Sequence, residues 1–266
     1  METRGMTASP VSGKTTPQLV RHAYAKPPLV EAVLEIRIKP LALNALGTLK
    51  QLAEQESARY PTLETIFTGG LEIEFEATGS KRPRVSGSSE EFGVSVTSAD
   101  KSELVQLRRN GISYHKLPPY SKWEDGFAET RRIWSKFASA LPIGSIVQIG
   151  VRYINRLSLP APCTLESYLR TYPEVSRSLS QVISTYVMQL SLPQKDLGNT
   201  VLVTRQALVS PPTPDVACVV LDNDLVMREE LDPQSNELWD RLQLLHERQI
   251  EIFEASITDE TRRLIA

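Results

Sequence analysis

The chain has 266 residues, of which 41% are hydrophobic and 23% charged, a composition typical of a globular protein with a substantial core. It carries 30 basic and 32 acidic residues, so its formal net charge of -2 provides no overall positive field for nucleic acid or an anionic membrane. No apolar run reaches the roughly 18 residues of a membrane span, and the start METRGMTASP lacks the apolar core of a signal peptide. The two cysteines, Cys163 and Cys218, fit reduced thiols better than a disulfide framework. We therefore expect a cytoplasmic protein.

The first half of the chain begins with a polar tail and continues with strands and helices. Residues 1–26 are rich in Ser, Thr, Pro, Gly and Lys without a hydrophobic period, and we interpret them as a flexible tail. Periodicity predicts the following elements in order: a strand at Leu29–Ile38, a helix at Leu41–Tyr60, a strand at Leu71–Phe75, a polar loop at Lys81–Glu90, a strand at Phe92–Thr97 and a hairpin at Leu104–Leu117. The hairpin prediction depends on Asn110-Gly111, a strong turn signal between two β-prone runs. An amphipathic helix then begins at Trp123.

The second half repeats this order. The pattern predicts, in order, a strand at Ser145–Leu157, a short helix at Thr164–Leu169, strands near Thr185–Leu192, Val201–Ala207 and Val216–Met227, and a closing helix that begins at Trp239.

A weak internal repeat relates the two halves. The segment Trp123–Leu141 aligns without a gap on Trp239–Ile257, and Val30–Ile38 aligns on Val147–Asn155 at almost the same offset. Coincidence between two amphipathic helices that follow β-hairpins is the alternative. A duplication predicts an α+β protein of two tandem β-α-β-β-β(-β)-α units, residues 27–142 and 143–266, with curved antiparallel sheets wrapped on long helices. Such units either share a TBP-like saddle or pack as two helix grips.

The familiar catalytic and metal-binding motifs are absent from the sequence. Gly13-Lys14-Thr15 lacks the earlier glycine of a phosphate-binding loop, and the three histidines have no His or Cys at ligand spacing. No Gly-x-Ser-x-Gly elbow occurs, and the run Asp222-Asn223-Asp224 is typical of a solvated turn. We therefore expect no metal and no cofactor, and the sequence identifies no catalytic residue.

Four segments carry a resemblance to a known group of proteins. They are PPLVEAVLEIRI at Pro27–Ile38, VQLRRNGISYHKLPPYSKWED at Val105–Asp125, IGVRYINRL at Ile149–Leu157 and the closing ELWDRLQLLHERQIEIFEASITDETRRLI at Glu237–Ile265. Together they resemble a sporadically distributed bacterial family of about this length with no established activity. The resemblance implies an accessory gene of the kind found in defence or toxin–antitoxin neighbourhoods.

Long polar and aromatic side chains gather on the predicted strands in the middle of the chain. We take these residues as candidates for ligand or partner binding: Arg108, Arg109, Tyr114, His115, Lys116, Arg152, Tyr153, Asn155 and Arg156. Arginine binds carboxylate or phosphate in bidentate fashion, and tyrosine adds rigid contact area. The alternative is a solvated sheet face whose arginines pair with Glu72, Glu74 and Glu76.

Three functions remain open at this stage. The first is a non-catalytic binding or regulatory protein that recognises a protein partner or a small anionic ligand. The second is an enzyme for a phosphorylated or nucleotide-like substrate, in which Arg108, Arg152 and Arg156 hold charge and His115 or Tyr114 acts as acid or base. The third is nucleic-acid binding across a saddle-shaped sheet, against which the overall acidity argues. Self-association as a homodimer is compatible with each of them.

Overall fold

A computed structural model describes residues 24–74, 84–120, 122–176, 178–179, 183–210, 213 and 215–266. In these residues nine strands form one antiparallel sheet in the order β2-β3-β4-β5-β1-β6-β9-β8-β7, accompanied by five helices. The strands are β1 (Leu29–Ile38), β2 (Thr62–Glu74), β3 (Arg84–Thr97), β4 (Glu103–Arg108), β5 (Gly111–Lys116), β6 (Ile146–Pro160), β7 (Tyr186–Gln194), β8 (Thr200–Val209) and β9 (Val216–Met227). The helices are α1 (Ala45–Gln55), α2 (Trp123–Ala140), α3 (Leu165–Tyr168), α4 (Glu237–Ser256) and α5 (Asp259–Ile265).

Strands β1 and β6 lie at the centre of the sheet and join the two halves of the chain. In β1, Val33 is opposite His115 of β5 on one side and Arg152 of β6 on the other. All further strands of the first half continue outward from β5, and those of the second half continue outward from β9. The two halves therefore share one sheet.

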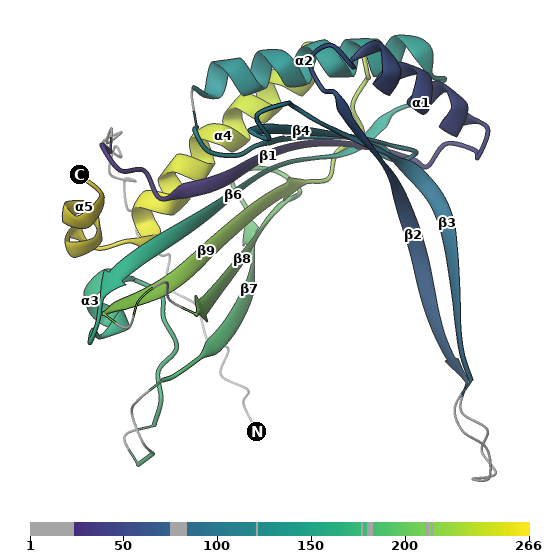
Figure 1. The fold of residues 1–266 in the computed structure, drawn as a ribbon. Helices are drawn as coiled ribbons and strands as arrows, with labels where there is room; N and C mark the ends of the chain where they lie inside the picture. The colour runs from purple at the N-terminus through teal and green to yellow at the C-terminus, as the bar shows by residue number, and fades with distance from the viewer. Residues whose placement is uncertain are drawn as a thin grey trace, which may run out of the picture.

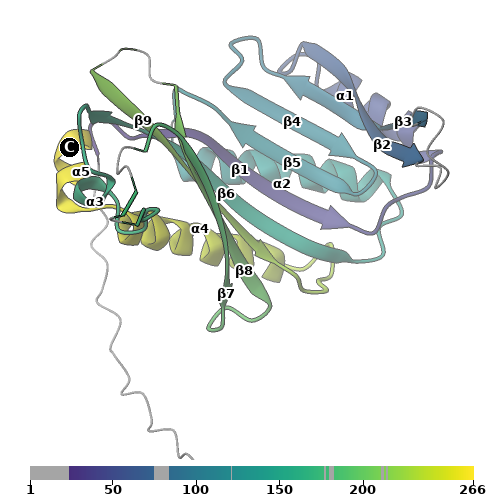
Figure 2. The ribbon, with the colours of Figure 1, turned by 90° about the horizontal axis from the view of Figure 1, so that it is seen from below.

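The long helices cover one face of this sheet. Figures 1 and 2 show α1, α2 and α4 on the same side, with the strands spread beneath them. On β1 the period of two turns Ala32, Leu34 and Ile36 toward the helices, where each is at most 1% exposed. The core that they enter contains residues of both halves, such as Phe137 of α2 and Leu242 of α4.

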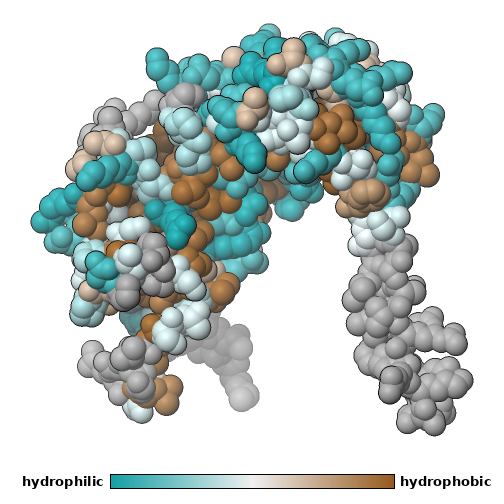
Figure 3. Space-filling model, in the orientation of Figure 1, coloured by the Kyte–Doolittle hydropathy of each residue, from teal (hydrophilic) through white to brown (hydrophobic). Residues whose placement is uncertain are grey.

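No helix of the described residues crosses the middle of the opposite face, which we call the open face. In Figure 1 the sheet bends so that β2 and β3 descend on one side and β7, β8 and β9 descend on the other. The space-filling view in Figure 3 shows the hollow that this bend leaves beneath the strands. Side chains on the open face are consequently reachable from solvent in the centre of the molecule.

Most predicted elements are confirmed, some to the residue. Strands occupy Leu29–Ile38 and Val216–Met227, and the hairpin at Asn110-Gly111 joins β4 to β5. The polar loop predicted at Lys81–Glu90 is wrong from Arg84 onward, where β3 begins; residues 81–83 lie outside the described part. Of the predicted tail, residues 1–23 lie outside the described part, whereas Tyr24 donates a hydrogen bond of 2.6 Å to Glu254 and belongs to the folded protein.

Candidate binding face

The nine candidate residues do not form one site, because neighbouring residues of a strand point to opposite faces. Four candidates lie on the open face of their strands: Arg108, His115, Arg152 and Arg156. Four others point toward the helices: Tyr114, Lys116, Tyr153 and Asn155. The ninth, Arg109, lies in the β4–β5 turn, where its Nε donates to the carbonyl oxygen of Leu41 at 2.7 Å.

On the first half of the open face, Arg108 is already paired. Its guanidinium lies 2.6 Å from Glu35 of β1, and the Nε of Arg37 donates to the other oxygen of Glu35 at 2.7 Å. Burial raises the pKa of Glu35, but hydrogen bonds and charge from Arg37 and Arg108 outweigh it, so the pKa is lowered overall. These contacts hold the carboxylate ionised and both guanidinium groups in place.

His115 lies between two partners on the open face. Its Nδ1 is 2.7 Å from a carboxylate oxygen of Glu31, and its Nε2 is 2.9 Å from the hydroxyl of Ser113. The hydrogen bond to His115 lowers the pKa of Glu31. The order of groups resembles a Ser–His–carboxylate relay. Ser113, however, is only 2% exposed, and β1 and β4 pair with β5 on both sides, so the ladders take up the backbone N–H groups that could stabilise an oxyanion. The three side chains therefore hold one another in position, and the Ser113 hydroxyl is not an accessible nucleophile.

On the second half of the open face, Arg152 forms a two-pronged pair with Asp222 of β9. Its Nε and one terminal nitrogen each donate to Asp222 at 2.7 Å. Arg205 of β8 approaches Asp222 at 3.4 Å and Asp224 at 3.9 Å, and its Nε donates to Gln189 of β7 at 3.0 Å. Together with the groups around Glu35 and His115, these side chains cross seven neighbouring strands of the sheet, from β4 to β7.

We call this set of side chains the polar belt. Its members are Glu31, Glu35, Arg37, Arg108, Ser113, His115, Arg152, Gln189, Arg205, Asp222 and Asp224. The side chains of Arg152 and Arg205 remain 38% and 39% exposed, so each can reach a further acceptor. The belt is thus a hydrogen-bonding surface of both signs of charge.

The candidates beneath the helices have packing roles. The hydroxyl of Tyr153 lies 2.6 Å from Nδ1 of His246, whose ring stacks on Trp123 with centroids 4.0 Å apart. Burial raises the pKa of Tyr114, which is 1% exposed. Lys116 lies 3.6 Å from Glu103 on the same side. Tyr153 thus joins β6 to α4 and, through His246, to α2, whereas Lys116 contacts the neighbouring strand β4.

The alternative prediction pairs the arginines of a solvated sheet face with Glu72, Glu74 and Glu76. On the open face, Arg108 is paired with Glu35 and Arg152 with Asp222. Glu76 and the side chains of Glu72 and Glu74 lie outside the described part of the chain. The run Asp222-Asn223-Asp224 is not the predicted turn, because it lies within β9. The period of two along β1, which places Glu31, Glu35 and Arg37 on one face, is the signal that could have identified the missing belt residues.

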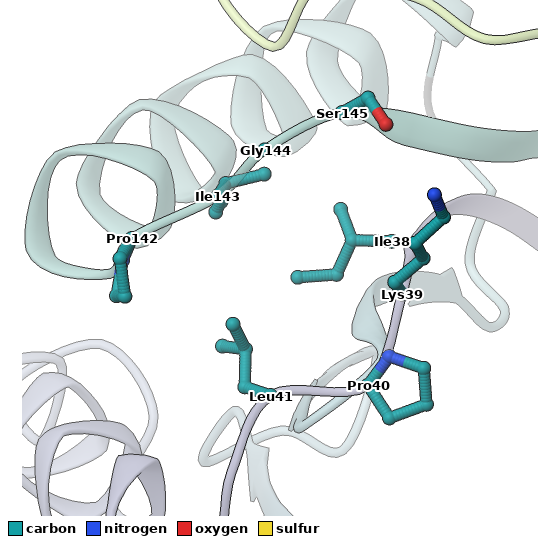
Figure 4. A pocket seen from close by; sticks show the side chains of 8 residues that line it. All are labelled: Ile38, Lys39, Pro40, Leu41, Pro142, Ile143, Gly144 and Ser145. Atoms are coloured by element: carbon teal, nitrogen blue, oxygen red, sulfur yellow. The ribbon is translucent and has the colours of Figure 1, made fainter.

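A hollow near the end of β1 does not provide a reaction site. Figure 4 shows it between the segments 38–41 and 142–145, where the end of β1 meets the start of β6. It measures about 270 Å³, and Lys39 is its single charged lining residue.

The His, Cys, Asp and Glu side chains of the described residues form no group of three that could hold a metal ion. Among the described helices, none has the length and apolar character that crossing a bilayer requires.

Comparison with protein-family models, with curated proteins and with solved structures finds no match to this chain.

Proposed function

We propose that this is a non-catalytic binding protein that recognises a protein partner with the open face of its sheet. The observation that carries the proposal is the polar belt, a row of charge-paired side chains across the open face, in which Arg152 and Arg205 are the half-exposed members. Complementary charges of both signs favour a specific orientation of a protein partner. Such a role fits the defence or toxin–antitoxin setting that the family resemblance implies.

The pairing within the belt favours a protein over a small anion or nucleic acid. Arg108 and Arg152 each face a carboxylate at 2.6–2.7 Å, so an incoming phosphate would have to displace Glu35 or Asp222. Nucleic-acid binding needs arginines and lysines that are not neutralised by neighbours, because its affinity derives largely from phosphate contacts. A protein surface supplies donors and acceptors together and can add to the belt without breaking it.

The arrangement of the candidates also weighs against the enzyme alternative. The enzyme alternative assigns the acid or base role to His115 or to Tyr114. Tyr114 lies beneath the helices, away from the open face, and His115 is held on the open face between Glu31 and Ser113. Of the three expected clamping arginines, Arg108 and Arg152 are engaged by carboxylates.

We further propose that the chain is a duplicated unit whose two copies form one saddle-shaped sheet. The strand order supports this, since moving outward from the centre meets β1, β5, β4 and β3 on one side and β6, β9, β8 and β7 on the other. The belt then runs across both copies and presents two related halves to a partner.

Affinity purification from the native host tests the binding proposal. Tagged wild type is compared with Arg205→Glu, which reverses a charge in the belt, and with Lys122→Glu, which makes the same charge change next to α2. We expect wild type and Lys122→Glu to retain the same protein, and Arg205→Glu to retain at least tenfold less. Equal retention by all three would show that the open face is not the binding surface.

A further inference from the structure

Strand β6 has a free edge outside the polar belt. Its pairing with β1 ends where Leu29 meets Asn155, whereas its pairing with β9 continues to Pro160. The N–H of Arg156 donates to the carbonyl oxygen of Pro28 at 2.8 Å, so it points to the β1 side. Because backbone groups alternate along a strand, the N–H and C=O of Ser158 point to the same side. No strand in the described part of the chain pairs with β6 there.

A hollow of about 280 Å³ lies along this edge. Pro27 and Pro28 form one wall, Leu264 and Ile265 of α5 form another, and Leu159 of β6 borders it. Leu264 is 39% exposed, although it is a large apolar side chain on a helix that otherwise closes a small core. The hollow thus combines apolar walls with a strand edge whose hydrogen-bonding groups are available.

Two positive charges line the same hollow. Lys26 and Arg156 both border it, and neither forms an ion pair with a carboxylate of the described residues. Within the described part of the chain, the Nε of Arg156 donates to the thiol of Cys218 alone, at 2.9 Å, and a thiol is a weak acceptor. The arginines of α5 differ, because Arg262 and Arg263 are paired with acidic neighbours.

We propose that this edge hollow binds an extended, acidic polypeptide segment by strand addition. The segment pairs its backbone with Ser158, places a carboxylate near Arg156 and Lys26, and packs an apolar side chain against Leu264. Main-chain hydrogen bonds supply affinity in this mode, and pockets for alternate side chains supply specificity. The unpaired charges decide the class of segment, since a basic peptide would leave both cations without a partner.

A peptide selection tests the proposal on the full chain. Random seven-residue peptides are displayed in two libraries, one with free C-termini and one with the peptide internal, which separates a terminal carboxylate from an acidic side chain. We expect one library to converge on sequences with an acidic group and a nearby apolar residue. The leading peptide, measured by fluorescence anisotropy, should bind at least tenfold more weakly when its acidic group is replaced by an amide.

Matched variants locate the binding. Ser158→Pro removes the edge N–H and should abolish binding, whereas Ser158→Ala keeps the N–H and should bind normally. If Ser158→Pro does not fold, Arg156→Glu should weaken binding at least tenfold and recover it for a peptide in which lysine replaces the acidic residue. Arg205→Glu, which tests the polar belt, should leave this binding unchanged, so the two proposals fail separately. Failure of both libraries to converge, or binding that survives Arg156→Glu, would overturn the proposal.

Discussion

Two aspartates of the open face, Asp222 and Asp224, have opposite environments although they lie two residues apart on β9. Asp222 accepts two hydrogen bonds from Arg152, whereas the nearest cation to Asp224 is Arg205 at 3.9 Å. Burial raises the pKa of Asp224, and the neighbouring charge of Asp222 adds to this effect. Asp224 is therefore a carboxylate that costs stability and lies where a partner could supply a donor. Binding-site residues often carry such a cost.

Replacement of Asp224 by asparagine should stabilise the protein at neutral pH. The folded pKa is raised above the unfolded value, so the ionised carboxylate lowers the stability of the folded state once the pH exceeds the unfolded pKa of about 3.9. At pH 7 we expect Asp224→Asn to raise the melting temperature by roughly 2–4 °C, the shift that about 1 kcal/mol produces in a protein of this size.

The higher melting temperature of Asp224→Asn should disappear below about pH 3.5, where the aspartate of the wild type is protonated in the unfolded chain as well. Asp222→Asn is the matched control and should lower the melting temperature, because it breaks the two-pronged pair with Arg152. Thermal unfolding followed by circular dichroism at both pH values checks these expectations. A lower melting temperature for Asp224→Asn at pH 7 would contradict them.

Helices α1 and α2 are joined by a buried ionic cluster. Glu56, which follows α1, and Glu129 of α2 are 6% and 4% exposed, and Arg132 reaches both at 2.6 Å. The hydroxyl of Tyr60 donates to Glu129 at 2.8 Å. The hydrogen bond from Arg132 is the largest cause that lowers the pKa of Glu56. Arg132 therefore holds two carboxylates ionised in the interior.

Replacement of Arg132 should destabilise the folded protein. Arg132→Ala leaves two buried carboxylates without their main partner, and we expect the free energy of unfolding to fall by about 2–4 kcal/mol at pH 7. Because the folded pKa of Glu56 is depressed, its contribution is present above the unfolded pKa of about 4.3 and is lost as the pH falls through the folded pKa. The deficit of the variant should therefore shrink in acid.

Urea unfolding at pH 7 and at pH 3 measures both expectations. Arg263→Ala, which removes an arginine with a side chain that is 68% exposed, is the control and should change the stability by less than about 1 kcal/mol. Surface substitutions usually change the free energy of unfolding by less than about 0.5 kcal/mol. A change no larger than this for Arg132→Ala would show that the cluster does not join the helices.

Local patterns predict the elements well, because periodicity and turn chemistry act within a few residues. The run Leu29–Ile38 and the Asn110-Gly111 turn are found as predicted. The start of β3 at Arg84 is not predictable in this way, since it depends on pairing with β2, an earlier part of the chain. The partners in ion pairs are even harder to predict from the sequence. Arg152 meets Asp222 only because the sheet brings β6 beside β9, and no local pattern contains that pairing.

At the scale of the whole molecule, the sheet makes the two halves interdependent. Nine residue pairs join β1 to β6, and the main core contains Phe137 from one half and Leu242 from the other. Neither half can separate without exposing the centre of the core and a long strand edge.

The protein should therefore unfold in a single cooperative transition. Differential scanning calorimetry should show one peak whose calorimetric and van't Hoff enthalpies agree. Two resolved transitions would mean that residues 27–142 and 143–266 behave as separate domains despite the shared sheet.

Photo-cross-linking in the native host tests most directly whether the open face binds the partner. A photoreactive amino acid is placed at Gln148 of β6 or Gln189 of β7, both on the open face, and at Ser135, exposed on α2 on the opposite side. We predict that the two open-face positions cross-link to the same protein and that Ser135 does not. Cross-linking of a partner from Ser135 alone would place the binding surface on the helices and contradict the account.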